Sequence, residues 1–272
     1  KVFSEEIQNQ ETDEFYLSQF VWELYENLSN PFSLKKQIIK YGAPGTGKTF
    51  QARQQTSLLF DIWKEEFAPE SDFTHYGQIE LVQFHPSFSY EDFIEGLRPI
   101  LDKNDQAQLT LQNGVFKEFC LSAGKWEIDV FNLHLEKEWD EIKIIDLLPY
   151  KDQLSSPHWD YIFEIENQNK LISHAIPPFF FIIDEINRAE LSRVFGELMY
   201  CLEYRGVKGC VKTQYANLNT NKTGMLELGG TYQFFIPSNI YLIGTMNTID
   251  RSVESFDFAL RRRFSWQEVN PD

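Results

Sequence analysis

The chain has little positive charge, and this shortage excludes whole classes of partner. Its 272 residues include 25 lysines and arginines against 41 aspartates and glutamates, so the formal net charge is −16. A protein that grips nucleic acid or an anionic bilayer over its whole surface needs the opposite balance. Direct DNA binding by this chain is therefore not expected.

Long apolar runs and cysteines are also scarce. The longest apolar run, residues 176–183, contains two prolines and is far shorter than the roughly 18 residues of a membrane-spanning helix, so no membrane association is expected. The three cysteines, Cys120, Cys201 and Cys210, cannot all pair, and their spacing suits neither a zinc site nor a CxxC redox pair. A reducing, cytoplasmic environment is the simplest interpretation.

The chain begins at Lys1 without an initiator methionine or a signal peptide, and it therefore resembles part of a longer protein. What it does contain is 42% hydrophobic and 15% aromatic residues. That content is enough to form a core in one large or two smaller domains, which excludes disorder as a class.

Strands and helices alternate along most of the chain. Residues 37–41 predict a strand that enters a glycine-rich turn and then a helix over 48–64. The apolar run 179–183 predicts a strand covered on both faces, followed by a helix over 189–203. We also expect strands at 80–84 and 240–245, a capped helix start at Ser89, a hairpin around Asn104 and Asn113, a helix at 115–123, a hairpin within 206–237 and a helix at 256–260. The alternation favours an α/β fold with a doubly wound parallel sheet flanked by helices, with β-hairpin insertions.

One motif carries specific chemistry, because the segment after the first strand fits the phosphate-loop pattern G-x-x-x-x-G-K-[ST]. Its residues are Gly42, Ala43, Pro44, Gly45, Thr46, Gly47, Lys48 and Thr49. A chain of this length matches the pattern by chance only roughly a few times in a thousand, which leaves little weight for a plain glycine-rich turn. Glycines let successive backbone N–H groups point at phosphates, Lys48 neutralises the β- and γ-oxygens, and the Thr49 hydroxyl is offered to Mg²⁺.

Polar residues also follow two of the predicted strands. Asp184 and Glu185 come directly after the strand at 179–183, where Asp184 would hold the magnesium ion's water shell and Glu185 would polarise the attacking water. A helix-capping turn is the alternative for this acidic pair. Asn247, just beyond the strand at 240–245, would reach the same edge and orient the water or touch the γ-phosphate. An ordinary turn asparagine is the alternative there.

A run of three arginines, residues 261–263, follows the expected helix at 256–260. A solvated helix end that complements the helix dipole is one interpretation, and an arginine placed against a transferring phosphoryl group is the sharper one. The helix leads away from the strand that carries Asn247, so Arg262 and Arg263 should face outward within one subunit. A charge that faces outward acts only on a neighbour.

These elements, in this order, resemble the AAA+ ATPase superfamily. The matching motifs are Ile-Ile-Asp-Glu-Ile-Asn-Arg at 182–188, Met-Asn-Thr-Ile-Asp-Arg-Ser at 246–252 and Ala-Leu-Arg-Arg-Arg-Phe at 259–264. Together with residues 83–99 and 114–120, they are similar to the McrB-type GTPase subunit of modification-dependent restriction systems. The resemblance covers residues 34–124 and 177–266.

The resemblance implies a role for each matched residue. Lys48 and Thr49 would form Walker A, Asp184 and Glu185 Walker B, Asn247 the sensor 1 position, Asp250 and Arg251 the loop that marks this subgroup, and Arg262 and Arg263 the fingers that reach a neighbour's γ-phosphate. It also implies Mg²⁺ as cofactor and a hexameric ring that hydrolyses nucleotide at subunit interfaces. An McrC-like subunit would stimulate hydrolysis and carry a nuclease.

The domain boundaries follow from the same comparison. Residues 1–32 predict an N-terminal helical segment, and residues 33–272 predict the large α/β nucleotide-binding domain of an AAA+ protein. Within it, residues 125–175 show no repeat or chemical motif and predict an insertion. The family's DNA-recognition domain and helical lid are not found in this sequence, so DNA would be contacted mainly through a domain outside it.

GTP as the substrate is implied by the resemblance only, with ATP as the alternative. The run from Asn247 to Asp250 looks like the N-K-x-D guanine reader of small GTPases, but Asn247 would face the γ-phosphate, far from the base. Two other functions stay open: an AAA+ ATPase of remodelling or chaperone type, and a nucleotide-gated assembly scaffold that barely hydrolyses. The intact Glu185, Asn247 and Arg263 argue against the scaffold.

Overall fold

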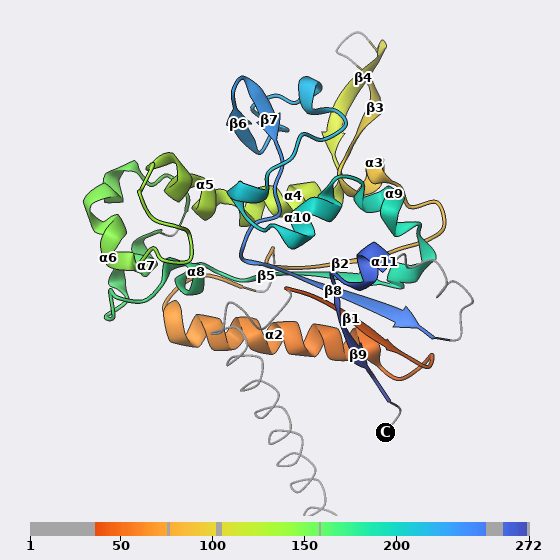
Figure 1. Ribbon diagram of the computed structural model, residues 1–272, viewed down its shortest axis with the longest axis horizontal. Helices are drawn as coiled ribbons and strands as arrows, with labels where there is room; N and C mark the ends of the chain where they lie inside the picture. Colours follow the sequence, from red (N-terminus) through yellow and green to blue (C-terminus); the bar gives the residue numbers. More distant parts are fainter. Residues whose placement is uncertain (1–35, 75–76, 102–104, 158, 249–257, 271–272) are drawn as a thin grey trace, which may run out of the picture. The chain divides into compact units, whose positions relative to one another are not determined.

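The computed structural model describes residues 36–74, 77–101, 105–157, 159–248 and 258–270. Five of the strands in these ranges form a parallel sheet in the order β2-β5-β8-β1-β9 (Figure 1). Their bounds are β1 (Gln37–Gly42), β2 (Ile79–Gln83), β5 (Phe179–Asp184), β8 (Ile240–Asn247) and β9 (Ser265–Glu268). The first four were predicted to within two residues, and β9 was not predicted.

The parallel arrangement decides where the ends of the strands lie. Since neighbouring strands point the same way, their carboxyl ends share one edge of the sheet. In the register of the sheet, Gly42 lies opposite Asn247 and Gln83 lies opposite Asp184. The residues that end β1, β2, β5 and β8 are therefore neighbours, although the sequence separates them widely.

Helices cover both faces of this sheet, as the doubly wound prediction requires (Figure 1). On one face lies α2 (Lys48–Phe67), which runs three residues beyond its predicted end and packs Ala52 against Ile182 and Ile243. On the other face lie α4 (Val115–Ala123), α9 (Leu191–Phe195) and α10 (Leu198–Glu203). The α4 bounds are those predicted.

Phenylalanines hold this second layer of helices on the sheet. Phe93 ends α3 (Tyr90–Phe93), whose start is capped reciprocally by Ser89 and Asp92 as expected. The Phe93 ring stacks on the Phe116 ring of α4, with 4.6 Å between the centroids. The Phe116 ring in turn lies 4.9 Å from that of Phe181 in β5. All three rings are fully buried, and each buried ring of this kind stabilises the fold by about 1.5–3 kcal/mol.

The prediction of one helix over residues 189–203 is wrong. Gly196 separates α9 from α10 with a φ of +49°, a left-handed conformation that favours glycine. A Cβ at this position would come within 3.3 Å of the Tyr90 ring. The apolar period continues across the break because Leu191, Phe195 and Leu198 are all buried, so the periodicity alone did not reveal two helices.

Within the described residues, two hairpins stand outside the main sheet. In the first, β3 (Glu95–Leu101) pairs antiparallel with β4 (Ala107–Asn113), as predicted. In the second, β6 (Leu226–Leu228) pairs with β7 (Thr231–Gln233). The second is much shorter than the predicted range 206–237, because the preceding residues form the single turns η3 (Val207–Gly209) and η4 (Ala216–Leu218).

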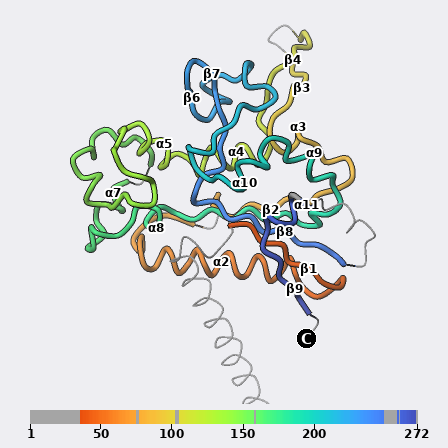
Figure 2. The backbone as a smooth tube through the Cα atoms, in the orientation of Figure 1, coloured from red at the N-terminus to blue at the C-terminus, as the bar shows by residue number. Residues whose placement is uncertain are grey.

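Residues 125–175 form a group of short helices at one side of the fold (Figure 2). They are α5 (Lys125–Asn132), α6 (Ile144–Leu147), η1 (Leu148–Gln153), α7 (Trp159–Glu164) and α8 (Ile172–Ala175). Asp129 joins them by accepting hydrogen bonds from the Ser155 hydroxyl at 2.9 Å and the Trp159 indole at 2.8 Å. Their interpretation as an insertion stays a prediction.

Some predictions fall outside the described residues. These are the helical segment at 1–32, and Asp250 and Arg251. Of the helix expected at 256–260, the described part is α11 (Phe258–Arg261). Within the described ranges, none of the helices combines the length and the apolar character needed to cross a bilayer.

Candidate active site

The phosphate loop makes a tight turn from β1 into α2. Gly45 and Gly47 have φ angles of +81° and +74°, which glycine adopts without strain. A Cβ at either position would meet no atom within 4 Å, so backbone conformation, not space, requires glycine here. Among the described residues no side chain caps the first turn of α2, and its N–H groups are therefore open to an anion.

Lys48 lies folded back on this loop. Its side-chain ammonium donates hydrogen bonds to the carbonyls of Gly42 and Ala43, at 3.2 and 2.6 Å, and to the Thr46 hydroxyl at 3.2 Å. Burial lowers the pKa of Lys48, and the nearby Asp184 carboxylate partly opposes that shift. The three hydrogen-bonded acceptors are neutral, so a phosphate would give this charge a stronger partner than the loop does.

Asp184, the last residue of β5, joins three elements. Its Oδ1 accepts a hydrogen bond from the Thr49 hydroxyl at 2.6 Å and another from the Thr245 hydroxyl of β8. Thr245 was not predicted as a site residue. A polar side chain near the carboxyl end of an otherwise apolar strand was the available signal.

The Thr49 hydroxyl and the Asp184 carboxylate are suitable ligands for Mg²⁺. A hydroxyl and a carboxylate are the hard oxygen ligands that this ion prefers, and it usually takes only one or two protein groups and completes its shell with water and phosphate oxygens. Within the described ranges, no three His, Cys, Asp or Glu side chains cluster closely enough to hold an ion by themselves. Thr49 and Asp184 are therefore suited to a magnesium ion that arrives with a nucleotide.

Glu185 is held in a strained position. Its φ of +53° is left-handed, which costs a non-glycine residue roughly 1–3 kcal/mol, and it precedes the turn η2 (Ile186–Arg188). Its Oε2 accepts from the Gln83 amide at 3.0 Å and pairs with the Arg188 Nε at 2.9 Å. Gln83 and Arg188 were not predicted as site residues. These two contacts hold the Glu185 carboxylate beside the end of β2.

Asn247 is the last residue of β8, the strand that pairs directly with β5. It was expected just beyond the strand and is instead its last residue, opposite Gly42 in the register. The N–H of the next residue, Thr248, donates to the Gly42 carbonyl at 3.1 Å. This bond holds the end of β8 against the start of the phosphate loop.

These side chains surround one cleft of about 230 Å³. Its lining consists of Gly45, Gly47, Lys48, Thr49, Phe50, Asp184, Glu185, Thr245 and Asn247. The remaining loop residues, Gly42, Ala43, Pro44 and Thr46, shape the turn behind it. Phe50 is 64% exposed and was not predicted, since no pattern distinguishes it from other helix residues.

Arg262 and Arg263 do not line this cleft. Arg263 comes two residues before β9, at the amino edge of the sheet, and its carbonyl accepts from the Gln37 amide at 2.7 Å. The expectation that both arginines face outward holds for Arg262, whose side chain is 59% exposed. It is wrong for Arg263, whose side chain is 13% exposed and forms an ion pair with Glu203 at 2.9 Å.

Comparison with known proteins places these motifs among named families. The sequence profile of the AAA domain (dynein-related subfamily) matches residues 155–264. The chain is 34% identical over 248 residues to the type IV methyl-directed restriction enzyme EcoKMcrB subunit of Escherichia coli (strain K12), a match that covers 90% of this chain and 38% of that protein.

A second relative is a component of another restriction enzyme. The chain is 25% identical over 243 residues to the type II restriction enzyme BsuMI component YdiS of Bacillus subtilis (strain 168), covering 86% of this chain and 57% of that protein. The chain thus spans less than two thirds of the length of either relative.

Proposed function

Because the chain belongs to the AAA+ superfamily, as an McrB-type protein, we propose that it is the GTP-hydrolysing module of a restriction complex that cleaves modified DNA. The observation that carries the proposal is the cleft in which Lys48, Thr49 and Asp184 meet. Two relatives that are themselves named as restriction enzyme components support the biological setting.

The phosphate loop would bind the triphosphate. Its backbone N–H groups and the amino end of α2 attract the phosphate oxygens, and Lys48 exchanges its carbonyl partners for them. Thr49 and Asp184 would hold Mg²⁺, which neutralises charge on the β- and γ-phosphates when bound. Thr245 keeps the Asp184 carboxylate oriented.

Glu185 would act as the base toward the attacking water, and the Asn247 amide would orient that water. Gln83 and Arg188 both hold the Glu185 carboxylate, so its movement toward a water molecule would require the release of one of these contacts. Slow basal hydrolysis by an isolated subunit, stimulated by an McrC-like partner, is consistent with this arrangement.

Arg263 would act on a neighbouring subunit. Gln37, which holds its carbonyl, begins β1, whereas the phosphate loop follows Gly42 at the other end. Five residue steps of about 3.3 Å separate the two ends by about 17 Å, beyond the reach of one side chain. An arginine at the amino edge is thus suited to a neighbour's γ-phosphate, in a ring that we propose to be hexameric.

Mixing two inactive variants tests the interfacial mechanism. In the complete protein with its partner, Lys48→Ala and Arg263→Ala should each lack hydrolysis, since an arginine finger contributes about 10³ to 10⁵ to turnover. A mixed interface that pairs an intact Lys48 with an intact Arg263 should recover activity. No recovery despite co-assembly would mean that Arg263 acts within its own subunit or not at all.

Base preference is a separate part of the proposal. GTP should bind at least tenfold more tightly than ATP, about 1.4 kcal/mol, in isothermal titrations of the same preparation. Equal dissociation constants would favour the AAA+ ATPase of remodelling or chaperone type. The proposed phosphate-binding site does not depend on whether the protein prefers GTP or ATP.

A further inference from the structure

The turn that carries Arg263 is tied to the end of α10 by one buried side chain. Gln37, which is 3% exposed, donates its amide N–H groups to the carbonyl of Arg263 at 2.7 Å and to that of Leu202 at 2.9 Å. Its amide oxygen accepts from the Arg205 guanidinium at 2.6 Å. The backbone before β9 and the backbone that ends α10 are thereby fixed relative to each other and to β1.

Glu203 directly follows Leu202 and is the last residue of α10. Its Oε2 lies 2.9 Å from a terminal guanidinium nitrogen of Arg263 and 3.8 Å from one of Arg262. The carboxylate is the more accessible partner, with 44% of the side chain exposed against 13% for Arg263. The Glu203 carboxylate thus lies on the solvent side of a mostly buried Arg263 side chain.

This contact restricts a side chain that otherwise has many rotamers. An arginine carries five N–H donors in one rigid plane, so a carboxylate on one edge does not use up its capacity for a phosphate. Catalytic groups depend strongly on placement, and an error of about 1 Å can cost a hundredfold in rate. A fixed carboxylate beside Arg263 therefore has a direct use in hydrolysis.

We propose that Glu203 is the positioning residue of Arg263, holding its guanidinium in the orientation that meets the phosphates of the neighbouring subunit. The inference rests on the proposed action of Arg263 on a neighbour. Glu203 touches neither nucleotide nor water and acts through the arginine alone. Because Arg263 is mostly buried, the free energy of unfolding of the Glu203 variants is measured as well, to separate a loss of positioning from a loss of stability.

The test compares Glu203→Ala with Glu65→Ala in the complete, assembled protein. Glu65 is an exposed glutamate of α2 on the opposite face of the sheet and serves as the matched control. Glu203→Ala should lower kcat about ten- to a hundredfold, leave KM, the nucleotide dissociation constant and ring assembly unchanged, and be partly rescued by Glu203→Asp. Glu65→Ala should leave all four quantities unchanged.

A double-mutant cycle then separates this inference from the function on which it rests. If Glu203 acts through Arg263, Glu203→Ala should cause no further loss of kcat in an Arg263→Ala background. An equal loss in both backgrounds, a rise in kcat on removing Glu203, or a loss of assembly alone would overturn the positioning role. A neutral Arg263→Ala would contradict the arginine's role in hydrolysis and this inference together.

Discussion

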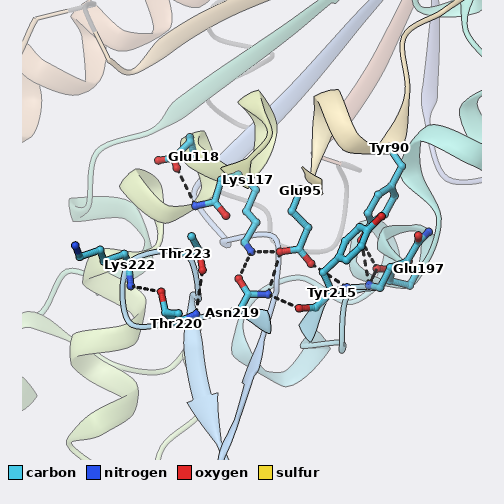
Figure 3. A network of polar contacts seen from close by, with 12 residues as sticks. Tyr90, Glu95, Lys117, Glu118, Glu197, Tyr215, Asn219, Thr220, Lys222 and Thr223 are labelled. Carbon is cyan, nitrogen blue, oxygen red and sulfur yellow. Dashed lines mark hydrogen bonds and ion pairs between the residues drawn. The ribbon is translucent and has the colours of Figure 1, made fainter. Parts of the chain in front are cut away.

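Two of the buried lysines in the described part of the chain, Lys48 and Lys117, differ in their readiness for a ligand. Lys48 is 6% exposed and Lys117 is 1% exposed. The Lys48 ammonium donates to two backbone carbonyls and a hydroxyl. Lys117 forms an ion pair with the buried carboxylate of Glu95 and donates to the Asn219 amide oxygen at 2.7 Å (Figure 3).

The partners of Glu95 complete this second arrangement. Besides Lys117, its carboxylate accepts from the Asn219 amide at 3.0 Å and from the Tyr215 N–H at 3.3 Å. Burial by itself would raise the pKa of Glu95, but hydrogen bonds from Lys117, Thr213 and Asn219 hold that pKa below its usual value. The network joins the start of β3, helix α4 and the segment around η4 (Figure 3).

The difference shows that burial of a charge does not by itself indicate a binding site. A buried charge with an opposite charge and complete hydrogen bonds has no capacity left for a ligand, and losing one partner destabilises the fold. A buried positive charge with neutral partners forms stronger hydrogen bonds when it exchanges those partners for an anion. For Lys48 and Lys117, the partners and not the exposure distinguish structure from binding.

The largest effect should come from Lys48→Ala, because it removes the side-chain charge of the loop that meets the β- and γ-phosphates. Nucleotide binding should become undetectable in isothermal titration, while the free energy of unfolding changes by less than about 1 kcal/mol. Glu185→Gln should bind nucleotide normally and suppress hydrolysis. Equal loss of binding in both variants would refute the division of roles between loop and base.

Lys117→Met should have the converse effect. It leaves the Glu95 carboxylate buried without its counterion, and the free energy of unfolding should fall by about 3–5 kcal/mol in urea titrations. The folded fraction should bind nucleotide as tightly as before. Lys222→Met, at an exposed lysine, is the control and should stay within about 0.5 kcal/mol. A nucleotide-binding defect in folded Lys117→Met would break the comparison.

The smallest expected effect is a loss of folding stability at acidic pH. The folded-state pKa of Glu95 lies below the unfolded value of about 4.5, so its contribution to stability is present above that value and lost as the pH falls through the folded pKa. The contribution should therefore shrink progressively as the pH falls below about 4.5. Glu95→Gln should lack this component, and parallel acid profiles of the two proteins would count against the network's charge pair.

Much of the candidate site could be predicted from the sequence because its features are local. Eight consecutive residues define the phosphate loop, and Asp184 and Glu185 directly follow a five-residue apolar strand. Helix α4 and hairpin β3–β4 were predicted for the same reason, since their periods and turns lie within short windows. The carboxyl edge where these residues meet followed from the alternation of strands and helices.

The rest could not be predicted, because it depends on contacts between distant residues. Gln83 reaches Glu185 only because β2 pairs with β5, and Arg263 reaches Glu203 only because β9 lies beside β1. No pattern within the chain encodes such pairs. The break at Gly196 escaped the periodicity because the buried face continues on both sides of it.

The sequence by itself determined which groups are available for phosphate chemistry, since a phosphate loop, an acidic pair and an arginine run are short motifs with their own chemical meaning. Only the tertiary structure decided how each group is held. The strand order places Lys48 among neutral acceptors, Glu185 between two donors and Arg263 against a carboxylate at the opposite edge. The physical reason is that hydrogen bonds and ion pairs act over a few ångströms, whereas the residues they join lie tens of positions apart.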